Sequence, residues 1–332
     1  MSAPKKVIAV VGATGIQGGS VVKAFLPMEN WTVRALTRDP SSKKARELAS
    51  QGCEVVEAEL ADPASLARAF EGVAAIFSNT DFWAPYSQAN KAGETREKAT
   101  AFGFQVEFSH AKNVADEAAK VPGLERFVYS ALGPMKKASR GKYPNSGHWD
   151  SKAEAVDYIE ESCPDLQGKV SFVYPSVYHT NPFLLPHKYP HIGDYAIMLP
   201  GDETMMMPVI HTDVTFGKFV RNLIVDEEPG VKLLACDVEV TMREVTDTWN
   251  RVTGQKATIT TETEDRMHEL TGLPYEVLDG PAYLAEYDFM HGVTGKVIRP
   301  KELKVKVETM TLEEIMQSRG LDALLSIEHP DL

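Results

Sequence analysis

The chain has 332 residues, of which 43% are hydrophobic and 25% are charged, and 35 basic against 47 acidic side chains give a formal net charge of −12. This composition is typical of a soluble globular protein and excludes a disordered chain, a collagen and a coiled coil. The negative charge argues against direct binding to nucleic acid, because neutralising phosphates requires concentrated lysine and arginine.

Cysteine spacing and apolar runs indicate the compartment. Cys53, Cys163 and Cys236 lie far apart and form no CxxC pair, so we expect neither a disulfide framework nor a structural zinc site. The apolar stretch near the N-terminus has only the length of a strand, which predicts no signal peptide. No apolar run approaches the roughly 20 residues that span a bilayer. We therefore expect a cytoplasmic protein that does not bind a membrane, with access to the nucleus left open.

Strand-like and helix-like patterns alternate in the first half of the chain. Strands are predicted at residues 7–11, 31–36, 54–58, 74–78 and 126–130, and helices at 18–25, 41–51, 63–70 and 94–119. This alternation predicts a parallel sheet covered by helices on both faces. A loop at 133–147 precedes a helix at 151–161 and a strand at 170–174, with which we expect the sheet to end near residue 175.

The second half of the chain is less regular. Residues 175–208 are rich in proline, histidine and tyrosine and show little periodicity, and they precede a helix at 213–225, a strand at 231–235 and a helix at 243–253. We predict an α/β fold of the Rossmann type, that is, a doubly wound parallel sheet with a smaller C-terminal α/β annex. Residues 1–175 would form the nucleotide-binding domain, and residues 176–332 would pack on the carboxyl edge of the sheet, where open α/β folds bind ligands.

A glycine-rich turn joins the first strand to the first helix. Gly12, Gly15 and Gly18 have the spacing GxxGxxG. Gly12 would permit the tight turn, Gly15 the approach of backbone to a pyrophosphate, and Gly18 the close packing of helix on sheet. The N–H groups at the start of the helix would face the anion. The sequence therefore predicts a dinucleotide site.

The end of the second strand indicates which dinucleotide is bound. An NAD site places an acidic residue there, whereas NADP requires a cation. Arg38 can bind a 2′-phosphate, with help from Lys43 or Lys44. Asp39 is a contrary signal, because it could hold a ribose or cap the helix that begins near Ser41. We expect NADP.

Three side chains are candidates for catalysis. Ser130 ends the fifth strand, where its hydroxyl could bond a substrate oxygen or a backbone group of a loop. His148 and Lys152 are four residues apart and share one face of a helix if that helix begins early enough. Lys152 is expected to hold the nicotinamide ribose. His148 could transfer a proton near neutral pH or could pack in the loop.

Other features indicate structure rather than chemistry. His187 and His191 lack further ligands at suitable spacing, so the sequence predicts no metal site. Met205, Met206 and Met207 are expected to line a core or a pocket. No serine lies in a GxSxG motif, so hydrolase chemistry has no support.

Taken together, these motifs resemble those of the NmrA-like family of atypical short-chain dehydrogenases, which includes NADP-sensing regulators and many fungal oxidoreductases encoded beside natural-product pathways. The resemblance extends over nearly the whole chain. It rests on the segments GATGIQG (12–18), TRDPSSKKA (37–45), AEL (58–60), NTDFW (79–83), VYSAL (128–132), HWDSK (148–152) and PSVYHTN (175–181).

The resemblance implies a set of cofactor contacts at the matching positions. The glycine turn would bind the dinucleotide through Gly12, Ala13, Thr14, Gly15, Ile16, Gln17 and Gly18. The residues around the 2′-phosphate would be Arg38, Asp39, Pro40, Ser41 and Ser42, and those flanking the adenine would be Glu59 and Leu60. The nicotinamide half would be surrounded by Thr80, Asp81, Phe82, Lys152, Pro175, Ser176, Val177 and Tyr178. Active short-chain dehydrogenases carry YxxxK, whereas this chain has His148 at the tyrosine position. Non-enzymatic sensors of the family share HxxxK, so the motif does not separate enzyme from sensor.

Two functions fit these observations. The first is an NADP(H)-dependent oxidoreductase that acts on a small apolar or aromatic substrate, with a natural-product pathway as one setting. The aromatic residues Phe82, Trp83, Tyr178 and Phe183 motivate this hypothesis. The second is a redox sensor that binds NADP(H) without chemistry and regulates a protein partner. We favour the oxidoreductase.

Overall fold

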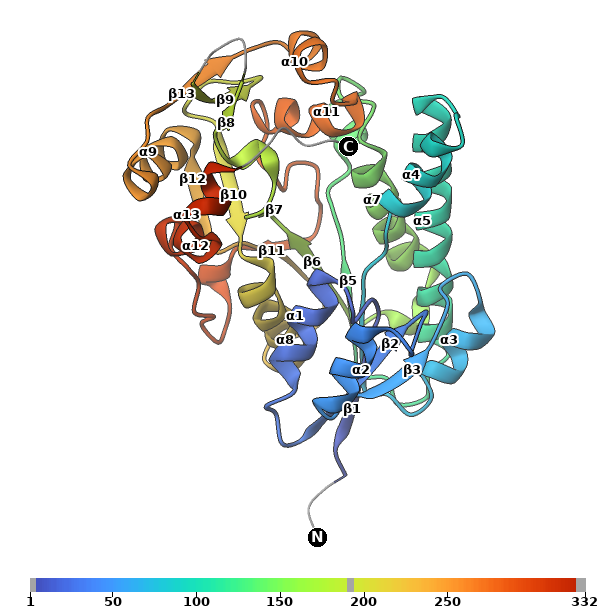
Figure 1. The fold of residues 1–332 in the computed structure, drawn as a ribbon. Coiled ribbons are helices and arrows are strands. Elements are labelled where there is room, and N and C mark those ends of the chain that lie inside the picture. Colours follow the sequence, from blue (N-terminus) through green and yellow to red (C-terminus); the bar gives the residue numbers. More distant parts are fainter. Residues whose placement is uncertain (1–3, 190–193, 327–332) are drawn as a thin grey trace.

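An eight-stranded sheet lies at the centre of the fold (Figure 1). The computed structural model describes residues 4–189 and 194–326. The strand order is β14-β11-β6-β5-β4-β1-β2-β3, and every neighbouring pair is parallel. The strands are β1 (Lys6–Val10), β2 (Trp31–Thr37), β3 (Glu54–Glu57), β4 (Ala75–Ser78), β5 (Arg126–Ser130), β6 (Val170–Pro175), β11 (Val231–Ala235) and β14 (Lys296–Ile298). The predicted Rossmann-type parallel sheet is confirmed.

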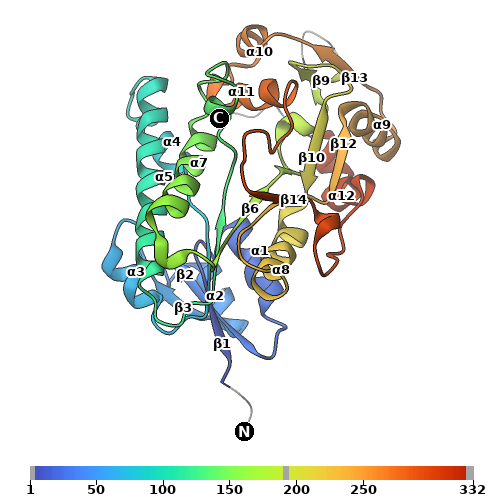
Figure 2. The same ribbon diagram turned by 180° about the vertical axis from the view of Figure 1, so that it is seen from behind.

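Two groups of helices cover the two faces of this sheet (Figure 2). One group is α1 (Ile16–Phe25) with α8 (Gly217–Val225), and the other is α3 (Pro63–Ala69), α5 (Arg96–Ala119) and α7 (Gly147–Ser162). Neighbouring residues of β1 point to opposite faces, so Ile8 and Val10 pack with α1 and α8 while Ala9 packs with the other group. Both faces are therefore buried, as a parallel sheet requires. The first part of the chain also contains α2 (Lys43–Ser50), α4 (Trp83–Lys91) and α6 (Met135–Ala138).

Most of the C-terminal part of the chain, from residue 176 on, lies above the carboxyl ends of the main strands (Figures 1 and 2), whereas α8, β11 and β14 belong to the layers of the main sheet. It contains two small sheets of order β12-β10-β7 and β13-β9-β8. Their strands are β7 (Val177–Tyr178), β8 (His187–Lys188), β9 (Tyr195–Leu199), β10 (Met206–Ile210), β12 (Val238–Thr241) and β13 (Ala257–Thr261). Besides α8, the helices of this part are α9 (Met242–Thr253), α10 (Glu264–Thr271), α11 (Tyr275–Leu284), α12 (Leu312–Arg319) and α13 (Leu321–Leu325). The predicted smaller α/β annex is confirmed.

The main sheet does not end near residue 175, and that expectation is wrong. β11 and β14 come from the C-terminal part, where β11 pairs with β6 and β14 pairs with β11. The apolar pattern at residues 231–235 predicts a strand but does not reveal its partner, because pairing depends on contacts between distant segments. The division into two domains at residue 175 stays a prediction, since the central sheet takes strands from both sides of it.

Two other segments differ from their predicted forms. Residues 175–208, which show little periodicity, contain β7, β8, β9 and the start of β10. The helix predicted at 213–225 begins with a π-helical turn at Thr212–Phe216 before α8. Short strands of two to five residues offer too few positions for a periodic pattern to be recognised.

The cysteines and the apolar helices can be compared with what the composition predicts. Cys53, Cys163 and Cys236 are free thiols and are buried. Burial raises the pKa of the Cys236 thiol to about 12, so it is not a nucleophile at neutral pH. Within residues 4–189 and 194–326, no helix combines the length and apolar character needed to cross a membrane.

The contact between α1 and α8 generates a first prediction. A Cβ atom on Gly217 would lie 2.0 Å from the backbone oxygen of Ser20, and the Gly217 N–H donates to the Ser20 hydroxyl at 2.9 Å. We expect Gly217→Ala to lower the free energy of unfolding by roughly 1–3 kcal/mol, because the two helices must move apart. Urea unfolding monitored by circular dichroism measures this change.

A matched control lies on the partner helix. A Cβ atom on Gly19 would meet the backbone oxygen of Ala13 at 3.5 Å, which is an ordinary contact. Gly19→Ala should leave the free energy of unfolding unchanged or raise it by up to about 1 kcal/mol, since alanine favours helix. Equal stability of the two variants would contradict the close-packing explanation.

Candidate functional site

A large cavity of about 1160 Å³ follows the carboxyl edge of the main sheet. This volume exceeds the roughly 300–1,000 Å³ of ordinary small-molecule sites and suits a dinucleotide together with a second small molecule. One end is lined by the turn between β1 and α1, and the other end is lined by α11 and neighbouring segments of the C-terminal part. The side chains between these ends come from segments that follow β2, β3, β4 and β6.

Most residues predicted for the cofactor line this cavity. They are Gly12, Thr14, Gly15, Ile16, Gln17, Arg38, Asp39, Ser42, Glu59, Leu60, Thr80, Asp81, Phe82, Lys152, Pro175, Ser176, Val177 and Tyr178. Ala13, Gly18, Pro40 and Ser41 do not line it. His148 lines the cavity, whereas Ser130 does not, and the Ser130 hydroxyl is buried with no hydrogen-bond partner among the described residues. Because Ser130 is closed off from the cavity, we give it no part in the chemistry below.

The glycine turn has the geometry of a phosphate cradle. Gly12 has a φ of +66°, which favours glycine, and a Cβ atom on Gly18 would lie 2.2 Å from the Gly12 oxygen. Gly15 is the N-cap of α1 and provides no side chain to bond the first N–H groups of that helix. Those N–H groups and the positive end of the helix dipole suit an anion. The three glycines thus fit a pyrophosphate.

The end of β2 provides a cation for the second anionic group. Arg38 lines the cavity, and no ion pair within the described residues occupies it. The carboxyl of Asp39 instead accepts hydrogen bonds from the Ser41 hydroxyl at 2.6 Å and the Ser41 N–H at 2.8 Å, which lower the pKa of Asp39. The expectation that Asp39 might cap the next helix is wrong, because Ser42 caps α2 by accepting from the Ala45 N–H.

Lys152 is held by a buried carboxylate that the sequence analysis missed. Glu107 lies on α5, is fully buried and forms an ion pair with the Lys152 ammonium group. Lys152 Nζ also donates to the backbone oxygen and the hydroxyl of Thr80, each at 3.1 Å. Glu107 accepts further from Thr80 at 2.9 Å and from the Ser151 hydroxyl. These contacts use the three donors of Lys152 and set its position beside the cavity.

His148 is held by a second buried carboxylate. Its Nδ1 lies 2.6 Å from Oε1 of Glu276, whose side chain is only 3% exposed. The His148 ring lies 4.9 Å from the Trp83 ring and 5.9 Å from the Phe82 ring, measured between centroids. The helix α7 begins at Gly147 rather than at residue 151, so it includes both His148 and Lys152 as their spacing requires. Glu276 is a functional candidate that no local pattern near His148 reveals.

The end of the cavity that α11 lines is apolar. Five apolar or aromatic residues named in the sequence analysis, Phe82, Trp83, Tyr178, Phe183 and Met207, line the cavity, whereas Met205 and Met206 do not. Further apolar lining comes from Leu132, Trp149, Val277, Pro281, Leu284 and Phe289. The Tyr178 hydroxyl accepts a hydrogen bond from the Gln17 amide at 2.5 Å, which links the C-terminal part to the glycine turn.

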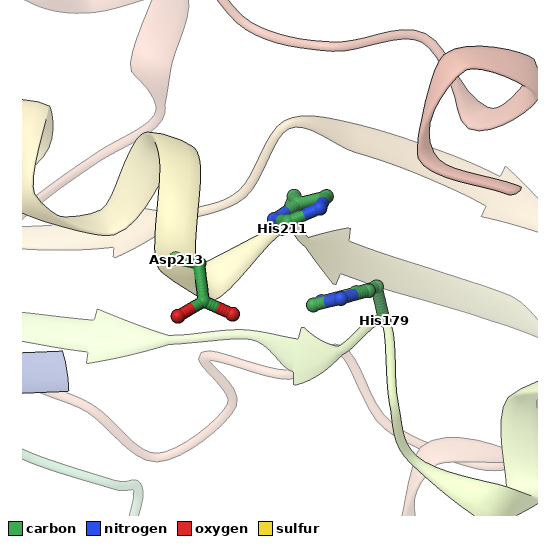
Figure 3. Close-up of side chains that lie close together, drawn as sticks. All are labelled: His179, His211 and Asp213. Atoms are coloured by element: carbon green, nitrogen blue, oxygen red, sulfur yellow. The ribbon is translucent and has the colours of Figure 1, made fainter. Parts of the chain in front are cut away.

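One group of side chains has the composition of a metal site (Figure 3). His179, His211 and Asp213 present possible ligand atoms that lie within 4.8 Å of one another. The two imidazole rings stack with centroids 3.9 Å apart and planes inclined by 15°. A metal about 2.0–2.1 Å from two ring nitrogens must lie near both ring planes, which stacked rings do not allow. The Arg319 guanidinium donates to the His179 carbonyl and adds positive charge, so we assign no metal here.

The histidines that the sequence analysis weighed as metal ligands lie elsewhere. His187 is in β8, and its Nε2 lies 2.6 Å from the carbonyl oxygen of Pro182. His191 lies outside the described residues. The sequence does not indicate the stacked pair in Figure 3, because β8, β9 and β10 separate the two histidines along the chain.

Comparisons with known proteins show what the chain is similar to. The NmrA-like family model matches residues 4–316. The chain is 27% identical over 270 residues to an NmrA-like family domain-containing oxidoreductase, hkm9, of Aspergillus hancockii, an alignment that covers 77% of this chain and 75% of the relative.

Solved structures share the fold at low identity. NmrA, a negative transcriptional regulator solved with NAD, matches with a TM-score of 0.67 and 19% identity over 97% of this chain and 100% of the regulator. Leucoanthocyanidin reductase of Vitis vinifera, solved with NADPH, matches with a TM-score of 0.66 and 17% identity over 95% of this chain and 98% of the reductase. The glycine turn, the HxxxK helix and the family match agree, and the chain belongs to the NmrA-like family.

Proposed function

We propose that this protein is an NADP(H)-dependent oxidoreductase that acts on a small apolar or aromatic substrate. The observation that carries the proposal is the position of His148 and Lys152. Both lie on α7 and line the cavity that the glycine turn and the apolar residues of α11 also line. The names of relatives such as the Aspergillus hancockii oxidoreductase support this reading, and the reductase neighbour solved with NADPH supports the choice of cofactor.

The polar half of the cavity fits the cofactor. The glycine turn would hold the pyrophosphate, and Arg38 with Lys43 would hold the 2′-phosphate, since both cations line the cavity there. Glu59 and Leu60 would flank the adenine. The segment from Pro175 to Tyr178 would lie beside the nicotinamide, whose role when bound is to supply or accept a hydride.

Side chains of the protein would then transfer the proton, bind the substrate and exclude water. In the direction of reduction, protonated His148 gives the proton on Nε2 to the oxygen or nitrogen of the substrate whose carbon receives the hydride. Lys152 presents a fixed positive charge next to the cofactor ribose. The apolar walls that include Val277, Leu284 and Phe289 bind the substrate and keep water away from the reacting atoms.

A redox sensor is the second candidate function. The observation that favours it is the ammonium group of Lys152, whose three donors are directed to Thr80 and Glu107 and so are already used inside the protein. In a sensor, this network would hold the cavity in shape, and bound NADP(H) would change the affinity for a protein partner. A role in a natural-product pathway is a setting for the enzyme and not for the sensor.

The cofactor assignment generates a prediction about Arg38. Arg38→Ala should weaken NADPH binding by about 10- to 100-fold, because a charge-assisted contact to the 2′-phosphate is worth roughly 1.5–3 kcal/mol. Binding of NADH should change little, since NADH lacks that phosphate. Titration of nicotinamide fluorescence measures both affinities.

Arg46 offers the matched control for this experiment. It lies on α2 in the same basic segment but does not line the cavity. Arg46→Ala should leave the ratio of NADPH to NADH affinity unchanged. An equal loss of affinity for both dinucleotides in the Arg38 variant would show that Arg38 does not read the 2′-phosphate.

The proposed chemistry generates a prediction about His148. His148→Gln should lower kcat for NADPH oxidation by about 10²- to 10⁴-fold, the usual contribution of a positioned acid, with the Kd for NADPH unchanged. Absorbance of the nicotinamide band, followed with a panel of carbonyl, imine and activated alkene substrates, measures the rate. His291→Gln, at an exposed site away from the cavity, is the control.

The same assay separates the two candidate functions. Substrate-dependent oxidation of NADPH by the wild-type protein supports the oxidoreductase. Tight binding of NADPH without oxidation by any member of the panel would refute it and leave the sensor.

A further inference from the structure

The start of α7 is anchored by a side chain from the C-terminal part. Glu276 is the second residue of α11, which lies beside α7 in Figure 1. Its carboxylate accepts hydrogen bonds from the backbone N–H groups of Gly147 at 3.1 Å and of His148 at 3.0 Å. These N–H groups have no acceptor within their own helix. Glu276 therefore determines where α7 begins.

The same carboxylate contacts the ring of His148. Oε1 of Glu276 lies 2.6 Å from Nδ1, and a carboxylate can only accept, so Nδ1 carries a proton. The other oxygen accepts from the Thr100 hydroxyl at 3.1 Å. With Nδ1 held in this way, Nε2 is the free nitrogen of a ring that lines the main cavity. The arrangement selects one tautomer of the neutral imidazole and one orientation of the ring.

The surroundings of the pair combine one near charge with several more distant ones. Glu276 is the charge in direct contact with the imidazole, and the Trp83 and Phe82 rings lie 4.9 and 5.9 Å from it between centroids. The other titratable groups nearby are Asp150 and Lys152 on α7, Tyr86 on α4, Arg96 on α5, Lys136 on α6 and Asp279 on α11. The Glu276 carboxylate is therefore the group that can hydrogen-bond to the imidazole, and the aromatic rings limit how the imidazole can turn.

A cap for the helix would not require a buried charge. Neutral serine, threonine or asparagine side chains accept the same backbone N–H groups without the cost of burying a carboxylate. A side chain 3% exposed that reaches α7 from the distant α11 and also contacts the imidazole does more than end a helix.

We propose that Glu276 is a positioning residue for His148, which fixes its tautomer and orientation and holds the charge of its protonated form. This inference rests on the proposed oxidoreductase function. In reduction, the substrate carbon gains the hydride, and the substrate heteroatom gains the proton from Nε2. The ring is left neutral, with the proton still on Nδ1 and hydrogen-bonded to the Glu276 carboxylate, and solvent returns one proton to Nε2. The C-terminal part thus supplies Glu276, and the first part of the chain supplies His148, which donates the proton.

The test is a pH titration of the His148 ring by NMR in the free protein, with Glu276→Gln as the variant. The signal is identified as the one missing from His148→Gln. Glutamine keeps the shape of the side chain but removes the negative charge next to Nδ1. The protonated ring loses its partner, so we expect the midpoint of the titration to fall by about one pH unit or more.

Kinetics provide the second readout. The rate of substrate-dependent NADPH oxidation requires protonated His148, so the pH at which the rate halves should fall together with the NMR midpoint. We expect kcat at pH 8 to fall by about 10- to 100-fold, while KM and the Kd for NADPH stay constant. Glu97→Gln is the control, because it removes one negative charge from the neighbouring cavity of about 800 Å³ that Glu276 also lines, without contacting His148.

A measurement on the wild-type protein does not depend on the folding of any variant. Nitrogen chemical shifts of neutral His148 should show the proton on Nδ1. A proton on Nε2, or an unchanged midpoint in Glu276→Gln, would overturn the proposal. If the wild-type protein oxidises no NADPH but shows the Nδ1 proton and the lowered midpoint, the positioning of His148 stands and the oxidoreductase function fails.

Discussion

The helix face that enters the cavity is held by two buried carboxylates, and the candidate site depends on them. Glu107 from α5 binds Lys152, and Glu276 from α11 binds His148. Burying a carboxylate is costly unless its charge is paired and its oxygens are hydrogen-bonded, and both carboxylates meet these conditions. The two side chains of the HxxxK motif are therefore preorganised by contacts made before any ligand arrives.

The parallel sheet decides where these groups can meet. All eight strands run in one direction, so the segments that follow β1, β2, β4 and β6 open at the same edge and together line one cavity. The C-terminal part covers that edge and is tied to the sheet by β11 and β14. The apolar end of the cavity can form only when both parts of the chain are folded, because residues such as Val277 and Leu284 lie on α11.

The choice between NADP and NAD depends on two neighbouring side chains at the end of β2, Arg38 and Asp39. Asp39 has the chemistry to hold a ribose, but its carboxyl is engaged by the hydroxyl and N–H of Ser41. Arg38 next to it faces the cavity without an ion pair among the described residues. Ser41 thus holds the Asp39 carboxylate in place, while the Arg38 guanidinium lines the cavity as a cation that suits a 2′-phosphate.

Local features of this protein could be read from its sequence. The alternation of strands and helices, the glycine turn, Arg38 and the shared face of His148 and Lys152 depend on residues within a few positions of one another, so periodicity and spacing reveal them. Tertiary structure alone decided that Glu107 and Glu276 bind Lys152 and His148, that α7 starts at Gly147 and that β11 and β14 join the main sheet. Glu276 lies 128 residues from His148, and nothing in the local pattern at either position encodes that contact. It exists because folding brings the start of α11 to the first N–H groups of α7, which have no acceptor within that helix.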